Sequence, residues 1–305
     1  MNTQRSKSGS KWLALTAAGM TIAALGATST AANAATYTLD FDQGADGGSV
    51  LYHANGTLKT DQWADWGLTN ISGVNDRTDS AALFNTYDTA YNTSRGQTSN
   101  LRAGWLRDDD LRTGSNWGTA DQGNVLIIQE QDGGNTNIFN NTGAYTADDE
   151  AQGGYVDFDF AEAVAFNSFS MLDIDDNGGG IMVEGQKADG SLLSIDIDEL
   201  MAMHHSMNGA GDNVAKGTSV SLNGVTMTQV GDKQGNNSMF RFDVDQAHLT
   251  SVRFSYPGSG AIAGLEWSTA EEPPQEIPEP SAMAGLLMLG FVAKRLKRNR
   301  SEAAV

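Results

Sequence analysis

Short runs in which apolar and polar residues alternate recur along the middle of the chain, bounded by Gly, Asn or Asp. The clearest run is YVDFDF, in which Val156, Phe158 and Phe160 can face a core while Tyr155 and the two aspartates face solvent. A period of two is typical of half-buried antiparallel strands, and long helical periodicity is nearly absent. The pattern predicts strands at 37–41, 67–71, 124–129, 154–160, 166–174, 181–186, 192–197, 219–222, 225–230, 239–244, 249–256 and 261–267.

Two dipeptides between these runs favour tight hairpins. Asn223-Gly224 and Asp189-Gly190 each separate two predicted strands, and both pairs suit two-residue connections. A dozen short strands within residues 35–270 predict one all-β domain, a single jelly-roll-like antiparallel β-sandwich, in preference to a barrel. Residues 85–123 show no regular period, and loops of that length tend to be functional.

The N-terminal segment has the order of a secretory signal peptide. Arg5, Lys7 and Lys11 precede an apolar run over 12–28, and small residues lead up to Ala34. This order predicts a signal helix within residues 1–34 that is removed after Ala34. A buried N-terminal helix is the less favoured alternative.

The net charge of the chain limits the classes of ligand that it can bind. The net charge is −19, and eight of the 19 basic residues lie in the two terminal segments, so the body between them is even more acidic. Nucleic acid is excluded as a partner because phosphate binding needs clustered Lys and Arg. Divalent cations, neutral sugars and cationic surfaces suit an acidic body better. Cysteine is absent, so burial alone must stabilise the core.

The C-terminal segment combines a Pro-Glu-Pro motif, an apolar run over 282–293 and a basic cluster. In this order at the chain end, residues 277–301 resemble the PEP-CTERM sorting signal of Gram-negative bacteria, preceded by a Pro/Glu-rich linker over 271–280. The apolar run would form a helix of about 18 Å, shorter than the roughly 30 Å hydrocarbon layer, which favours a transient inner-membrane anchor. The residues that carry the signal are Pro278, Glu279, Pro280, Lys294, Arg295, Lys297 and Arg298.

The body is similar to a β-sandwich domain often attached to that signal. The similarity rests on LDFD at 39–42, QGNVLIIQE at 122–130, the YVDFDF strand, LDIDDN at 172–177 and GSGAIAGLEW at 258–267. The resemblance implies processing by an exosortase near the Pro-Glu-Pro motif. It also implies release to, or retention at, the cell surface, periplasm or extracellular matrix, alongside exopolysaccharide, and it carries no catalytic assignment.

One acidic stretch matches a calcium loop. Asp173, Asp175, Asn177, Gly178 and Glu184 satisfy the pattern D-x-[DN]-x-[DN]-G-x₅-E, whose oxygen ligands suit calcium. The flanking sequence is strand-like, so the alternative is a hairpin turn with a solvated acidic rim. The acidic residues 148–150 could complete such a site, although a solvated loop is the favoured interpretation.

Aromatic residues in polar, loop-like sequence predict a ligand surface. Trp63, Trp66, Trp105 and Trp117 could stack on sugar rings, and Arg107 lies in the same set of long loops. Packing of each indole against the rim of the sandwich is the competing interpretation. We expect a polysaccharide ligand for this surface.

Residues 201–207 mix Met and His side chains. Copper accepts such donors, but a helical turn that packs its methionines on the sandwich is the favoured interpretation.

The sequence carries no motif for catalysis of a recognisable kind. It has no Cys nucleophile, no G-x-S-x-G, no H-E-x-x-H and no P-loop. We therefore expect a non-enzymatic surface or matrix protein that binds exopolysaccharide. The alternatives are a secreted carbohydrate-active enzyme on a lectin-like sandwich and a passive structural component of the matrix.

Overall fold

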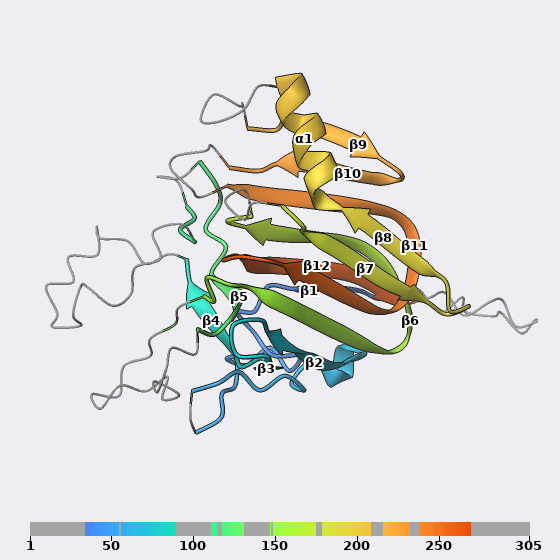
Figure 1. The fold of residues 1–305 in the computed structure, drawn as a ribbon. Helices are drawn as coiled ribbons and strands as arrows, with labels where there is room; N and C mark the ends of the chain where they lie inside the picture. The colour runs from blue at the N-terminus through green and yellow to red at the C-terminus, as the bar shows by residue number, and fades with distance from the viewer. Residues whose placement is uncertain are drawn as a thin grey trace, which may run out of the picture. The chain divides into compact units, whose positions relative to one another are not determined.

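Two long antiparallel strands, β6 (Gly154–Leu172) and β11 (Met239–Tyr256), organise the fold (Figure 1). The computed structural model describes residues 34–54, 56–89, 111–114, 118–130, 147, 149–174, 179–208, 216–231 and 238–269. Within these residues all strand pairs are antiparallel. The other elements are β1 (Thr36–Leu39), η1 (Ala64–Trp66), β2 (Leu68–Asn75), β3 (Ser80–Ala81), β4 (Phe84–Asp88), β5 (Asn124–Ile128), β7 (Met182–Lys187), β8 (Leu192–Asp196), α1 (Ile197–Asn208), β9 (Ser219–Leu222), β10 (Val225–Gln229) and β12 (Ala261–Thr269).

β6 and β11 fold one continuous sheet into two layers. Layer 1 has the order β4-β5-β12-β6-β11-β10-β9, with β1 also paired to β12, and uses the second half of β6 and the first half of β11. Layer 2 has the order β3-β2-β6-β11-β7-β8 and uses the other two halves. The register between the long strands shifts between Leu249 and Ser251, which is where β11 passes from one layer to the other.

The prediction of an antiparallel all-β body is confirmed, with two differences in detail. Residues 154–160 and 166–174, predicted as two strands, form the single strand β6, and β11 likewise joins 239–244 with 249–256. The residues between each pair, AEAVA at 161–165 and DQAH at 245–248, were not predicted as strand, but they form the bend between the layers. β3 and β4 were not predicted, because residues 80–88 show no clear alternation.

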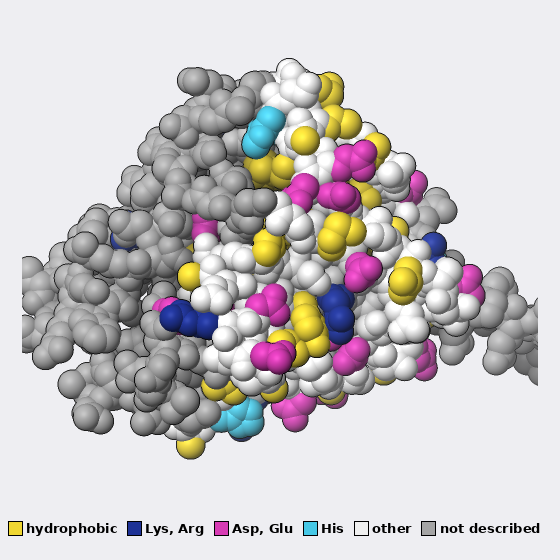
Figure 2. Space-filling model, viewed as in Figure 1, with side chains coloured by type: hydrophobic (Ala, Val, Ile, Leu, Met, Phe, Trp, Pro, Cys, Tyr) yellow, Lys and Arg dark blue, Asp and Glu magenta, His cyan; other side chains and the backbone are white. Residues whose placement is uncertain are grey.

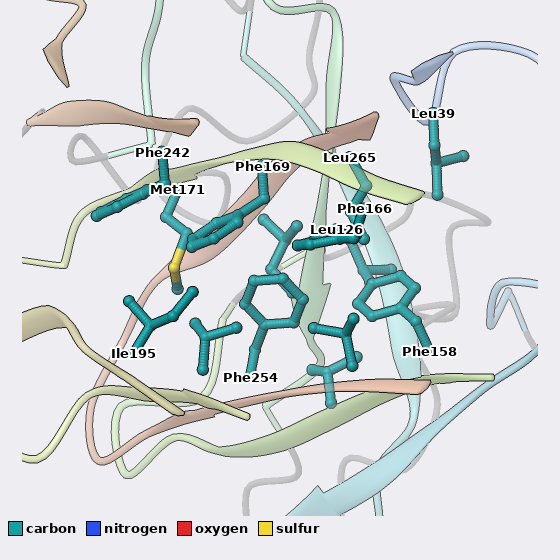
Figure 3. Close-up of a cluster of buried hydrophobic side chains, with 14 of the residues drawn as sticks. Leu39, Leu126, Phe158, Phe166, Phe169, Met171, Ile195, Phe242, Phe254 and Leu265 are labelled. Atoms are coloured by element: carbon teal, nitrogen blue, oxygen red, sulfur yellow. The ribbon is translucent and has the colours of Figure 1, made fainter. Parts of the chain in front are cut away.

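The core lies between the two layers (Figure 3). Phe169 and Phe242 come from layer 1 and stack at 4.6 Å between ring centroids, whereas Phe158 and Phe254 come from layer 2 and meet edge to face at 5.6 Å. All four side chains are buried, as are Val156 and the other inward residues of the alternating runs. The predicted facing of YVDFDF is therefore confirmed.

A second, smaller apolar cluster lies on the outer side of layer 1. Leu172, Val125 and Ala261 point away from the main core and pack with Leu111, which follows the long connection after β4. Thr89 and Thr113, at the two ends of this connection, are joined by a hydrogen bond of 2.7 Å between their hydroxyls. Layer 1 is therefore covered on both faces near β5 and β12.

Local turn chemistry explains both hairpins. Asn223 and Gly224 take positive φ values of 50° and 80° between β9 and β10, as a two-residue type I′ turn requires. The connection between β7 and β8 is longer than predicted. Lys187 N donates to Ser191 O at 2.9 Å, so three residues form the loop, with Gly190 at φ 82°.

The helix α1 follows β8 and packs on β9 and β7, next to the strands of both layers (Figure 1). Its buried residues Ile197, Leu200, Met201 and His204 recur at helical spacing and form one face. The predicted helical turn at 201–207 is confirmed. Met203 packs partly against the core, but Met207 is 68 % exposed.

The first and last described strands lie side by side. β1 pairs with β12 from Thr36 opposite Ser268 to Leu39 opposite Leu265. Beyond the ladder, Ala35 N donates to Thr269 Oγ1 at 3.0 Å and Thr269 N donates to Ala35 O at 2.9 Å. We call this contact between the two ends the terminal seam.

The predicted signal helix, except for Ala34, and the whole predicted C-terminal helix lie outside the described residues, as do the seven residues of the sorting signal. Within the part of the chain that the structure describes, no helix has the length and apolar character needed to cross a membrane.

Candidate ligand-binding surface

The outer face of layer 2 carries a row of polar side chains that crosses five strands. Strand pairing places Ser72, Asp157, Arg253, Glu184 and Ser194 opposite one another on β2, β6, β11, β7 and β8. Side chains at paired positions of an antiparallel sheet point to the same side. The residues next to them along each strand, such as Phe158 and Phe254, are buried in the core. The row therefore points outward.

Arg253 is the centre of this row. Its Nε donates to Asp157 Oδ1 at 2.7 Å and its Nη2 donates to Asp157 Oδ2 at 2.8 Å, which is a bidentate pair. The guanidinium carbon lies 3.9 Å from the centre of the Tyr155 ring. The hydrogen bonds that Arg253 donates to Asp157 are the main cause of its raised pKa, and the charge of Glu184 raises the pKa further. Groups on three strands thus hold one cation in a fixed orientation.

Carboxylate, amide and hydroxyl groups surround Arg253. Figure 2 shows the side of the molecule on which β7, β8 and α1 face the viewer, and there Asp and Glu side chains are scattered among uncharged ones with few Lys or Arg. Such a face can exchange hydrogen bonds with many hydroxyl groups while it repels anions. The two rows next to that of Arg253 are Asn70, Asp159, Ser251, Gln186 and Leu192 on one side, and Val74, Tyr155, Ser255, Met182 and Asp196 on the other.

The structure removes Trp63 from the predicted ligand surface. Its side chain is 0 % exposed, packs edge to face on Phe41 at 5.8 Å, and donates from Nε1 to Gln43 O at 2.9 Å. Because the indole N–H has a backbone acceptor, the whole ring can be buried despite its polar neighbours in sequence. The competing interpretation, packing against the sandwich, is correct for Trp63.

Trp66 is partly buried and stacks on Tyr37 at 5.8 Å between ring centroids. Its carbonyl accepts a hydrogen bond of 3.2 Å from Trp267 Nε1, so it is tied to the rim of the core. Trp105, Trp117 and Arg107 lie outside the described residues. Of the four predicted tryptophans, the structure therefore describes one that is buried and one that is partly buried.

The predicted calcium ligands are only partly described. Asp173 is 1 % exposed at the end of β6, where its Oδ2 accepts from Ser259 Oγ at 3.0 Å. Glu184 lies instead in the outward row of Arg253, and Asp175 and Asn177 lie outside the described residues. In the described ranges, no group of three or more His, Asp or Glu side chains could hold a metal ion. Calcium binding stays a prediction.

The acidic residues near 149 are buried, so the expectation of a solvated loop is wrong. Asp149 is 6 % exposed and accepts from Gly260 N at 2.6 Å. Glu150 is 1 % exposed and accepts from Asn75 Nδ2 at 2.9 Å, with Arg77 Nη1 at 3.5 Å from its carboxylate. These partners are distant in sequence and fix the end of the sandwich opposite the terminal seam.

Three aspartates that the sequence analysis did not propose as a site lie close together where β1 ends and β5 begins. Asp42 Oδ1 accepts from Asn124 N at 2.7 Å. Partial burial raises the pKa of the Asp42 carboxyl, and the nearby charges of Asp40 and Asp121 raise it further. The repulsion between these carboxylates is a local cost to stability.

The sequence contained a usable signal for the Arg253 row. Val252, Phe254 and Tyr256 alternate with polar residues, so Arg253 belongs to the outward set of its strand by the same rule as Tyr155 and Asp157. Pairing of the two strands, which sequence alone did not give, was needed to place the three together.

Comparison with known proteins gave no match: no family model, no curated protein and no solved structure is significantly similar to this chain.

Proposed function

We propose that this chain is an exported, non-enzymatic protein of the cell surface or extracellular matrix that an exosortase sorts and that binds a neutral polysaccharide of the envelope or matrix. In this proposal the N-terminal signal helix starts export, the C-terminal hydrophobic helix anchors the chain transiently in the inner membrane, and the body is a jelly-roll-like sandwich. The terminal patterns and the acidic, antiparallel body support it.

The Arg253 row is the observation that carries the binding proposal. Asp157 accepts from two of the five guanidinium N–H donors, and the guanidinium lies over the Tyr155 ring. A fixed guanidinium binds oxygen ligands with little loss of side-chain entropy. The surrounding carboxylates disfavour an anionic polysaccharide, because like charges repel.

The test compares two arginines on the same strand. Arg253 and Arg241 both lie on β11, have side chains 43 % and 42 % exposed, and each pairs with an aspartate, but Arg241 lies on the outer face of layer 1. The full-length chain is mixed with insoluble cellulose, chitin, mannan and, as a cationic comparison, chitosan. We expect retention on a neutral polysaccharide that Arg253→Met lowers about tenfold, equivalent to about 1.4 kcal/mol, and that Arg241→Met leaves unchanged.

Three results would contradict the proposal. An equal loss of retention in Arg253→Met and Arg241→Met would indicate non-specific adsorption. If the native chain is not retained on any polysaccharide, the passive structural role is favoured. Retention on chitosan alone would indicate simple attraction of an acidic body to a polycation.

A carbohydrate-active enzyme is the second candidate. Asp157 and Glu184 flank Arg253 on β6 and β7, two strands apart, which corresponds to about 9.6 Å between backbones. Inverting glycosidases use carboxyl groups about 6.5–9.5 Å apart, so this pair is the one to test. Release of reducing sugar that Glu184→Gln abolishes would establish the enzyme, and its absence with retention intact would support binding.

A further inference from the structure

The buried face of α1 includes one titratable side chain. His204 is 0 % exposed and lies in line with Ile197, Leu200 and Met201, which pack on the sandwich. A charged imidazole on such a face would lose its hydration without compensation. The protonation state of His204 therefore matters for the packing of the helix.

The surroundings of His204 suit only the neutral ring. Its Nε2 lies 2.8 Å from Thr218 Oγ1, in the segment that enters β9. The ring meets Phe240 of β11 edge to face at 5.9 Å. Within the described residues, the buried Nδ1 has no hydrogen-bond partner. Since protonated histidine carries an N–H on both ring nitrogens, protonation would leave a buried donor without an acceptor.

No acidic side chain stands next to His204 on its helix, because positions three and four residues away hold Leu200, Met201, Met207 and Asn208. His205 is the neighbouring ionisable ring, 6.1 Å away between centroids. Burial lowers the pKa of His204, and His205 lowers it further. The helix itself carries Asp198, Glu199 and His205, and β9 has no charged or titratable side chain. The charged or titratable groups on the other elements around α1 are Asp196 on β8, Glu184 and Lys187 on β7, Lys216 before β9, and Arg241, Asp243, Asp245, His248, Arg253 and Tyr256 on β11.

We propose that His204 is an acid-sensitive latch, which holds α1 on the sandwich while its ring is neutral and releases the helix when the ring takes up a proton. Release would uncover Leu200 and Met201 together with the side of the core next to β9. The latch does not rest on the proposed glycan binding.

The direction of the pH effect follows from linkage. The docked ring has a lower pKa than the ordinary value of about 6.5, so the undocked state binds the proton more readily. Docking is insensitive to pH above that value and weakens as the pH falls below it. The docking equilibrium constant of α1 falls by at most about tenfold for each pH unit, and it stops falling once the docked ring is itself protonated.

Hydrogen exchange on the full-length chain tests the latch. After correction for intrinsic exchange rates, we expect the protection of α1 amides to fall by up to about tenfold between pH 7.5 and pH 5.5, with β6 amides unchanged. In His204→Gln, which retains a hydrogen-bonding group for Thr218 but cannot titrate, α1 protection should not change with pH. In His205→Gln the docked ring should take up its proton at a higher pH, because the neighbouring charge is gone, so the loss of α1 protection should end at a higher pH and be smaller.

Constant α1 protection in the native chain, or an equal fall in His204→Gln, would overturn the proposal. If His204→Gln does not fold, the NMR titration of the native chain decides the matter. A His204 resonance that titrates at or above its ordinary pH excludes the latch, and titration below that pH supports it.

Discussion

Phe169 of β6 and Phe254 of β11 meet edge to face across the two layers, with 5.1 Å between ring centroids. Each ring also contacts another buried phenylalanine, Phe242 or Phe158, so one chain of aromatic contacts joins layer 1 to layer 2. Because these residues lie on the two strands that belong to both layers, the contact holds the bend of the sheet closed.

Phe254→Ala should therefore destabilise the fold severely. The side chain is 0 % exposed, and loss of a buried phenylalanine costs about 3–5 kcal/mol through lost burial and the remaining cavity. Denaturant unfolding measures the change. Leu192→Ala is the control, since Leu192 is 63 % exposed and should change stability by no more than about 0.5 kcal/mol. A similar effect in both variants would disprove the two-layer core.

Tyr256→Phe should be neutral or stabilising, unlike most changes in a core. The Tyr256 hydroxyl is buried with no hydrogen-bond partner among the described residues, and burial, followed by the charge of Asp149, raises its pKa. Removal of an unsatisfied buried polar group is expected to gain up to about 1 kcal/mol in the free energy of unfolding. A loss of more than about 1 kcal/mol would show that the hydroxyl is hydrogen-bonded.

Gly153→Ala should destabilise far more than Gly190→Ala, although both glycines have positive φ values, 65° and 82°. A Cβ at Gly153 would lie 2.1 Å from Tyr256 O, whereas nothing lies within 4 Å of one at Gly190. We expect a cost of about 1–2 kcal/mol at Gly190 from the backbone alone. The steric clash should add roughly 1–3 kcal/mol at Gly153. Equal melting temperatures for the two variants would contradict this packing.

Asp42→Asn should raise the melting temperature at neutral pH. The folded state raises the pKa of Asp42, so it holds the proton more tightly than the unfolded chain, and stability falls as the pH rises through the folded pKa. The gain from the substitution should thus be larger at pH 7 than at pH 3.5, where the native carboxyl is more often protonated.

Asp189→Asn is the control with the opposite sign. Hydrogen bonds from Ser191 lower the pKa of Asp189, so its carboxylate stabilises the fold above the unfolded pKa and that stability is lost as the pH falls. This substitution should lower the melting temperature at pH 7. The same sign for both substitutions would exclude the electrostatic explanation.

Alternation and turn chemistry predicted most strands, because both depend on neighbours in sequence. The facing of Val156, Phe158 and Phe160 followed directly from a period of two. The continuity of β6 and β11 could not be predicted in this way, because it depends on pairing between residues far apart in sequence, such as Asp157 with Arg253, which are 96 positions apart. Local sequence does not record such pairing.

The candidate sites were harder to predict because burial of polar groups depends on distant partners. Trp63 lies in a polar stretch, yet the Gln43 carbonyl allows its indole to be buried. Asp149 looks solvated in sequence, yet it accepts from Gly260 N, 111 residues away. In both cases the polar neighbours in sequence predicted an exposed side chain, and the side chain is buried.

Because of the terminal seam, the two ends of the described body lie next to each other. β1 can pair only after β12 has been synthesised. Folding that must wait for contacts between residues more than 200 positions apart is slow to complete. The same geometry suits circular permutation: a short linker from Thr269 to Ala35 would permit new ends at the exposed turn that contains Gly190.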